Sequence, residues 1–216
     1  MKNIIISGSK RVVVNSKETV VFPTLAEVDI EKDIVVIPTK LLDKVSSGRN
    51  VKLYFELEND AFFQKLKDLL SKTEKPKGVF RYRRITASDK NESLLVEDII
   101  MITSLFGEPE AIFVKRSNDD FTPKHVIVTL NFGGGTMAHV EYTLLDKEQI
   151  EFDWCGIQQI IEFNSDEMSA LISETTPSSA LTMRTDTILE NAHTVDENVL
   201  AKLAKYRNLL DGGMES

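Results

Sequence analysis

The chain has 216 residues, of which 42% are hydrophobic and 28% are charged. These proportions are typical of a globular protein that can bury a sizeable core in one large domain, or in one domain with a small appendage. The formal net charge of -8 argues against general nucleic-acid binding, because an acidic surface repels a phosphate backbone. We therefore expect a globular protein with no nucleic-acid partner.

Cysteine content and the start of the sequence bear on location. Cys155 is the single cysteine, so no disulfide can form within the chain, and one thiol fits a reducing compartment. The apolar run at residues 4–6 is too short for the hydrophobic part of a signal peptide or for a membrane span. We expect a cytoplasmic protein with no membrane partner.

The first part of the chain is rich in short apolar runs that are mostly β-branched or aromatic. Glycine, serine, asparagine and proline residues separate these runs, and this pattern predicts short strands joined by turns. The expected strands are residues 4–6, 12–14, 20–22, 34–37 and 51–55. Residues 39–45 could supply one short helix after the fourth of these strands.

Two helices with a strand between them follow. The first helix is amphipathic, and Asn59 and Asp60 are candidate N-caps for it. Its apolar positions recur at helical spacing and are Phe62, Phe63, Leu66, Leu69 and Leu70. A strand is expected at residues 79–86, and a second helix at 94–106 with Ser93 as its cap. The second helix is apolar around much of its circumference, so we expect it to be buried.

The rest of the chain predicts a strand-rich region and a final helix. Five further strands are expected at residues 111–115, 125–132, 136–145, 150–154 and 158–163. The three glycines at residues 133–135 fit a tight hairpin turn, because glycine readily adopts positive φ angles. Residues 165–192 are polar and predict a loop with short helical pieces. A capping box at residues 194–197 marks the start of the last helix.

The order of these elements carries a resemblance to a known family. The strand that starts at Gly78, the apolar helix that ends at residues 105–109, and the hairpins at residues 126–141 and 150–163 follow one another in a set order. This order resembles the C-terminal half of the Gfo/Idh/MocA oxidoreductases, the family of glucose-fructose oxidoreductase and inositol dehydrogenase. The resemblance covers roughly residues 60–165.

The resemblance implies an α+β fold with a distinctive division. The expected architecture is an open, largely antiparallel β-sheet with helices on one face, preceded by a reduced α/β segment that is a Rossmann remnant. The expected parts are residues 1–58, the reduced Rossmann-like segment, and residues 59–216, the sheet domain. In the family, the other face of the sheet often packs against a partner subunit.

The front segment departs from the family's cofactor-binding pattern. In the family, the first strand leads into Gly-x-Gly-x-x-Gly, and those glycines let a helix N-terminus reach the cofactor pyrophosphate. Here the strand leads into Gly8, Ser9, Lys10 and Arg11, and the residues that follow resemble a strand. An intact site of the family type is therefore not expected. If NAD(P) binds, these four residues would hold its phosphates.

The catalytic positions depart as well. The family's Glu-Lys-Pro motif ends a Rossmann strand, whereas Lys75 follows a helix here, and the family position falls at residues 54–56 with no lysine. The family's His-x-x-Asp pair falls at Glu97 and Ile100. A buried glutamate can act as an acid or a base, but Ile100 cannot orient it. The alternative is that Glu97 lies at a solvated or ion-paired helix edge.

The sequence contains residues for two further kinds of site. Arg81 and Arg83 share one face of their strand under period-2 alternation. They could bind a carboxylate or phosphate, or make ion pairs across the sheet or an interface. The three histidines and Cys155 are scattered without metal-ligand spacing, so no metal site is expected.

Two main functional hypotheses remain open. The first is a catalytically degenerate relative of the oxidoreductases, without a cofactor, which associates through its sheet face as a homodimer or as a hetero-complex with a full-length relative. The second is an NAD(P)-dependent oxidoreductase acting on a sugar-like or small carbonyl or hydroxyl substrate, with Gly8, Ser9, Lys10 and Arg11 at the cofactor and Glu97 as acid or base. A third hypothesis is small-anion binding by Arg81 and Arg83.

Overall fold

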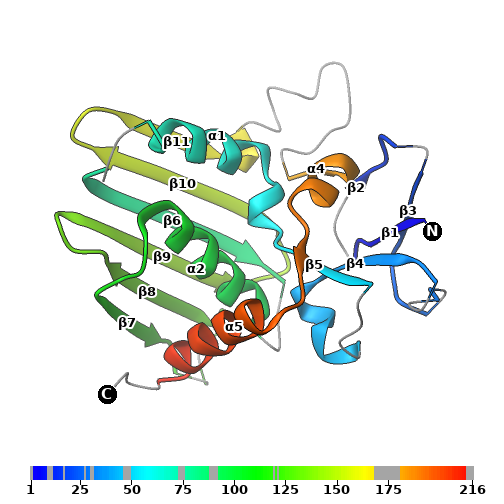
Figure 1. Ribbon diagram of the computed structural model, residues 1–216. Coiled ribbons are helices and arrows are strands. Elements are labelled where there is room, and N and C mark those ends of the chain that lie inside the picture. The colour runs from blue at the N-terminus through cyan, green and yellow to red at the C-terminus, as the bar shows by residue number, and fades with distance from the viewer. Residues whose placement is uncertain are drawn as a thin grey trace.

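The computed structural model describes residues 2–8, 12–16, 18–26, 28–29, 32–45, 50–72, 76–87, 92–118, 120, 122–167 and 181–212. Two large sheets lie side by side, and most of the helices lie against the larger one (Figure 1). A third, two-stranded sheet joins β2 to β12, whose bounds are Val12–Val13 and Met183–Arg184.

The first sheet has the strand order β13-β5-β4-β1-β3. Its strands are β1 (Asn3–Ile6), β3 (Thr19–Phe22), β4 (Ile34–Pro38), β5 (Val51–Tyr54) and β13 (His193–Thr194). The four strands β3, β1, β4 and β5 are parallel, and β13 adds to β5 antiparallel. Strand β1 is flanked by β3 on one side and by β4 on the other, so the strand order reverses at β1.

The second sheet has the order β11-β10-β6-β9-β8-β7. Its strands are β6 (Gly78–Thr86), β7 (Ala111–Arg116), β8 (His125–Asn131), β9 (Thr136–Leu144), β10 (Gln149–Gly156) and β11 (Ile160–Asn164). All neighbouring pairs are antiparallel except β6 and β9. The expected open, largely antiparallel sheet is thus confirmed.

Three helices lie on one face of the second sheet (Figure 1). They are α1 (Ala61–Leu70), α2 (Ser93–Phe106) and α5 (Glu197–Leu210). The Phe62 ring of α1 stacks on Phe163 of β11 at 4.1 Å between centroids, and Phe106 of α2 stacks on Trp154 of β10 at 5.2 Å. Helix α2 is buried along most of its length, as its apolar sequence predicts.

Short helical segments connect the larger elements. Residues 39–45 were expected to hold a short helix, and the structure has the 3-10 helix η1 (Thr39–Lys44) there. A second 3-10 helix, η2 (Leu57–Asn59), links β5 to α1. No helix in the described part of the chain is long and apolar enough to span a membrane.

Helix caps and turns match the sequence in part. Asp60 caps α1, since its side chain accepts from the N–H groups of Phe62 and Phe63. The predicted cap Ser93 is instead the first residue of α2, after Glu92 in a left-handed conformation. Helix α5 is capped by Asp196, which accepts from the N–H of Val199, rather than by the first residue of the predicted capping box. The side chain of an N-cap residue reaches the N–H groups two or three residues later. Val199 is three residues after Asp196, so its N–H is within reach of the Asp196 carboxylate.

The chain returns to the first sheet near its end. Residues 165–192 were expected to form a loop with short helical pieces, and from residue 181 the structure has β12, the helix α4 (Thr185–Glu190) and then β13. Strand β13 completes the first sheet and α5 then packs on α2. The division at residue 58 stays a prediction, but the two sheets are joined by the last segment as well as by α1.

Candidate functional site

A buried ionic cluster lies where the end of β5 meets α2 and the second sheet. We define the buried cluster as Glu56, Tyr82, Arg84, Glu97, Asp98 and Tyr142. Glu56 follows β5, the tyrosines and Arg84 come from β6 and β9, and the remaining two acids come from α2. Arg84 is 1% exposed and Asp98 is 0% exposed. Charges so deeply buried must be paired or protonated.

Alternation along β6 brings Arg84 into this cluster. Phe80, Tyr82 and Arg84 face α2 and are buried, while Arg81 and Arg83 face the opposite side and are exposed. The sequence predicts this division, because successive side chains of a strand point to opposite faces. Arg84 therefore reaches α2 from the sheet.

Asp98 is the acceptor at the centre of the cluster. Its Oδ2 accepts hydrogen bonds from the hydroxyls of Tyr82, at 2.7 Å, and Tyr142, at 2.6 Å. Arg84 Nε lies 3.1 Å from the same oxygen and donates to the Tyr82 hydroxyl at 2.9 Å. Burial raises the pKa of Asp98, and the Arg84 guanidinium and both hydroxyls oppose that rise.

Glu97 lies beside Glu56 in the same cluster. The backbone N–H of Glu56 donates to Glu97 Oε2 at 3.2 Å, and Arg84 Nη1 lies 3.6 Å from Glu56 Oε2. Burial raises the pKa of Glu97 well above its ordinary range, and the nearby Glu56 carboxylate adds to the rise. Glu97 is 2% exposed, so it does not lie at a solvated helix edge.

The structure thus brings together two positions that the resemblance singles out. Residues 54–56 mark the place of the family's motif lysine, and Glu97 marks the place of the histidine of the His-x-x-Asp pair. Glu56 and Glu97 are in direct contact. Ile100, at the aspartate position, is buried and apolar. Sequence reasoning missed Arg84, Asp98 and Tyr142, although acids on an otherwise apolar helix are a signal that they need a buried cationic partner.

Gly8 lies at the carboxyl end of β1, with a φ of 59°. Strand order reverses around β1, and ligands of open parallel sheets bind at such a switch point. Lys40, on η1, approaches Gly8 so closely that a Cβ there would lie 2.9 Å from its Nζ. The segment after Gly8 leads to β2 instead of a helix. Ser9, Lys10, Arg11 and Lys75 lie outside the described residues.

Arg81 and Arg83 lie on the face of the second sheet that α1, α2 and α5 do not cover. Arg81 pairs with Asp153 at 3.5 Å, and Arg83 pairs with Glu141 at 3.1 Å and with Glu151 at 3.4 Å. These are the cross-strand ion pairs that one of the two interpretations predicted. A shallow hollow of about 590 Å³ lies over them.

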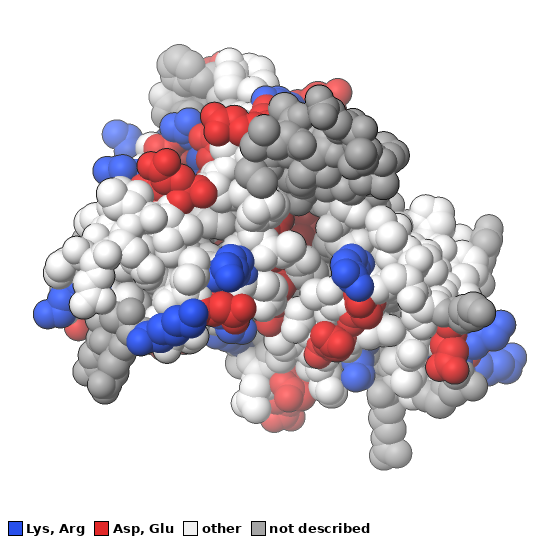
Figure 2. All heavy atoms as spheres, turned by 90° about the horizontal axis from the view of Figure 1, so that it is seen from above, with Lys and Arg blue, Asp and Glu red and all other residues white. Residues whose placement is uncertain are grey.

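In the part of the chain that the structure describes, no three His, Cys, Asp or Glu side chains are arranged so that they could hold a metal ion. Each histidine has a separate partner: His125 bonds Thr143, His139 bonds Glu141, and His193 bonds Glu58. In the view of Figure 2, basic and acidic side chains are interspersed.

Comparison with known proteins gives matches among solved structures alone. No protein-family profile and no curated protein matches the chain. A probable dehydrogenase from Thermotoga maritima is 16% identical, with a TM-score of 0.47 over 61% of this chain and 49% of that protein. The myo-inositol dehydrogenase from Lactobacillus casei, solved with NAD(H) and myo-inositol, is 12% identical, with a TM-score of 0.44 over 74% of this chain and 73% of that one.

A dehydrogenase from Chromobacterium violaceum is 10% identical, with a TM-score of 0.47 over 60% of this chain and 46% of that protein. The chain thus spans about half the length of two of these three structures. The matched proteins are dehydrogenases, inositol dehydrogenase among them, which is the class of protein that the sequence resemblance names.

Proposed function

We propose that this chain is a catalytically degenerate relative of the Gfo/Idh/MocA oxidoreductases, and that it acts through association by the uncovered face of its second sheet. The observation that carries the proposal is the contact between Glu56 and Glu97 inside the buried cluster. Residues 54–56, the place of the family's Glu-Lys-Pro motif, hold no lysine, and a glutamate, Glu97, stands at the histidine position.

The surroundings of Glu56 leave little room for a substrate. The cavity beside Glu56 and Arg84 measures about 20 Å³, which suits roughly one water molecule. Leu57, Ile150 and Met183 also line it. A sugar-sized substrate and a nicotinamide ring would have to displace packed side chains, so hydride transfer at this place is disfavoured.

The alternative is an NAD(P)-dependent oxidoreductase for a sugar-like or small carbonyl or hydroxyl substrate. One observation favours it: Lys40 Nζ stands over Gly8 at the switch point of the parallel sheet, where a phosphate of a nucleotide would be attracted. Glu97, with its raised pKa, would then be a proton donor.

A titration of the purified protein with NADH and with NADPH, by cofactor fluorescence and calorimetry, separates the two. The degenerate relative is expected to bind neither below about 1 mM. Binding in the micromolar range that is weakened by Lys40→Gln, and unaffected by the matched change Lys65→Gln on the exposed side of α1, would establish the alternative instead.

Association by the uncovered sheet face has its own test. The face carries ion-paired but partly exposed charges, among them Arg81 at 61% side-chain exposure, and the exposed side chain of Phe113 on its edge strand β7. Light scattering is expected to give a dimer, and Arg81→Glu is expected to weaken it at least about tenfold through like-charge repulsion. The control Lys65→Glu lies on the helical side. A monomer at every concentration would rule out the homodimer, and the hetero-complex with a full-length relative would then be the form of association to test.

We also propose a cytoplasmic location for this protein.

A further inference from the structure

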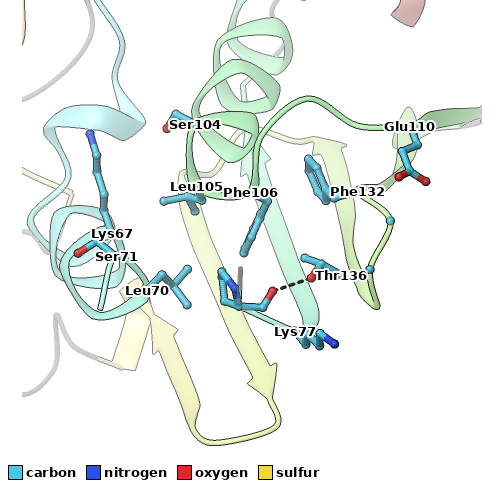
Figure 3. Close-up of a pocket in the computed structure, with 13 residues that line it drawn as sticks. Lys67, Leu70, Ser71, Lys77, Ser104, Leu105, Phe106, Glu110, Phe132 and Thr136 are labelled. Atoms are coloured by element: carbon cyan, nitrogen blue, oxygen red, sulfur yellow. Dashed lines mark hydrogen bonds between the residues drawn. The ribbon is translucent and has the colours of Figure 1, made fainter. Parts of the chain in front are cut away.

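A second hollow lies at the end of the second sheet where β6 and β9 begin. It has a volume of about 680 Å³ and is bounded by the ends of α1 and α2 and by the turn between β8 and β9 (Figure 3). Ligand pockets commonly measure about 300–1,000 Å³. None of its lining residues belongs to the buried cluster, so the hollow is a separate feature of the molecule.

The interior of the hollow is apolar and partly aromatic. Leu70, Leu105, Phe106 and Phe132 supply most of its apolar lining, and Figure 3 shows them around the hollow. The rings of Phe106 and Phe132 are 5.3 Å apart between centroids. Both rings are partly exposed, so an aromatic or aliphatic body placed here would gain contact area and exclude water.

Glu110 places an unpaired charge at the edge of this lining. Its carboxylate packs against Gly133, where an added Cβ would collide with it. The side chain makes no hydrogen bond or ion pair with any residue that the structure describes. The glycine turn therefore leaves room for an exposed, unpaired carboxylate at the rim of the hollow that Phe106 and Phe132 line, and a cation bound in the hollow could pair with it.

The two helices add to the same preference. Both α1 and α2 end at the hollow, and the carboxyl end of a helix carries a partial negative charge. Two lysines, Lys67 and Lys77, stand on the rim. Figure 3 shows their ammonium groups directed away from Phe106 and Phe132.

We propose that this hollow binds a small organic amine with an aromatic or aliphatic body. The ammonium group pairs with Glu110, and the body lies on Phe106 and Phe132. Charge-assisted hydrogen bonding and the ring faces both favour a cation over a neutral or anionic compound of the same size.

The test is a titration near neutral pH with three probes of similar shape: phenethylamine, 2-phenylethanol and 3-phenylpropionate. Binding is followed by amide chemical shifts in NMR spectra. Phenethylamine is expected to shift the signals of residues 105–106 and 133–134, and to bind at least about tenfold more tightly than the other two probes. Glu110→Gln is expected to abolish that difference, whereas Glu190→Gln, on α4, keeps it.

Three results would overturn the proposal. One is binding of the anionic or neutral probe as tight as that of the amine. Another is an unchanged affinity of Glu110→Gln for the amine, with circular dichroism showing that the variant is folded. The last is no chemical-shift change with any probe up to about 10 mM, a concentration at which even a weak specific site would fill.

Discussion

Asp98 is the residue on which the buried cluster depends most. Its Oδ2 accepts hydrogen bonds from the hydroxyls of two tyrosines and lies 3.1 Å from Arg84 Nε. If the carboxylate lost its charge, these hydrogen bonds would lose their charge assistance and the Arg84 guanidinium would lose its ion pair. Burial alone disfavours that charge, and the three donors compensate for the cost.

Asp98→Asn is expected to lower the free energy of unfolding by about 3–5 kcal/mol, because buried Arg84 would keep its charge and lose its nearer carboxylate partner. The control is Asp153→Asn, which removes an exposed ion pair with Arg81 and should cost about 1 kcal/mol or less. Urea unfolding at constant pH measures both. Equal losses in the two variants would mean that the cluster contributes no more than a surface pair.

Glu97 gives the protein a pH dependence of predictable sign. Burial, and then the Glu56 carboxylate, raise its pKa in the folded state, so the folded protein holds the proton more tightly than the unfolded chain. The stability that this provides is complete below the ordinary pKa of about 4.3 and is lost as the pH rises through the folded-state pKa.

Glu97→Gln is therefore expected to flatten the decline of stability above about pH 5, since glutamine does not titrate. Urea midpoints measured at several pH values for both proteins test this. Parallel curves for the wild type and the variant would show that Glu97 does not carry the effect. The matched control is Glu190→Gln on the exposed side of α4, which also replaces a glutamate with a glutamine.

The sequence predicts part of the buried cluster. It marked Glu97 through the resemblance. It did not indicate that residue 56 touches residue 97, because that contact joins the end of a short strand to a helix that begins after a long intervening segment. Long-range contacts of this kind leave no periodic trace.

At the scale of elements, β13 is the feature that holds the end of the chain to the first sheet. The strand is two residues long, too short to be stable by its backbone pairing with β5 alone. His193 Nε2 lies 2.5 Å from Glu58 Oε2, and the His193 ring packs at a tilt against Phe55, at 4.8 Å between ring centroids. Asn191 adds a hydrogen bond to Asn59 at 3.3 Å. These side chains stabilise the attachment of α4 and β13.

His193→Ala is expected to loosen residues 181–196 at a cost of about 1–3 kcal/mol, the range for a hydrogen bond to a charged group. Faster cleavage of this segment in limited proteolysis would report it. His125→Ala is a matched control, because its ring bonds Thr143 on the second sheet instead. Identical cleavage of the two variants would mean that β13 is held by other contacts.

The sequence predicts the long helices and strands better than the shortest strands. The strands of the second sheet and the helices that cover it are recognisable by their apolar periodicity. Helix α2 is recognisable because it is apolar around most of its circumference. By contrast, β12 and β13 have two residues each. Strands so short carry no alternation to detect, and tertiary pairing alone defines them.

At the scale of the whole molecule, the two large sheets share one hydrophobic core. Residues from β1, β4 and β5 belong to the same cluster of buried side chains as residues from the second sheet and from α5. The connection is made twice, through α1 and through the segment from β13 to α5. Such continuity favours a single cooperative unfolding transition.

Amide hydrogen exchange should therefore show similar global protection for Val35 in β4 and Val140 in β9, two fully buried strand residues of this shared core in different sheets. The exchange of Val13 in β2, which is exposed, is a local reference and should be faster. A difference of more than about 3 kcal/mol between the two core amides would indicate that the sheets unfold as separate units.

The pairing of β2 with β12 has a consequence for protein engineering. Residues 12–13 are held beside residues 183–184 in a parallel ladder, in the stretch where a dinucleotide-binding protein needs a helix whose amino end faces the pyrophosphate. Grafting a glycine-rich fingerprint onto the loop after β1 would therefore be insufficient to build a nucleotide receptor. A designer would also have to release the β12 ladder and rewrite the downstream residues with helix-forming side chains.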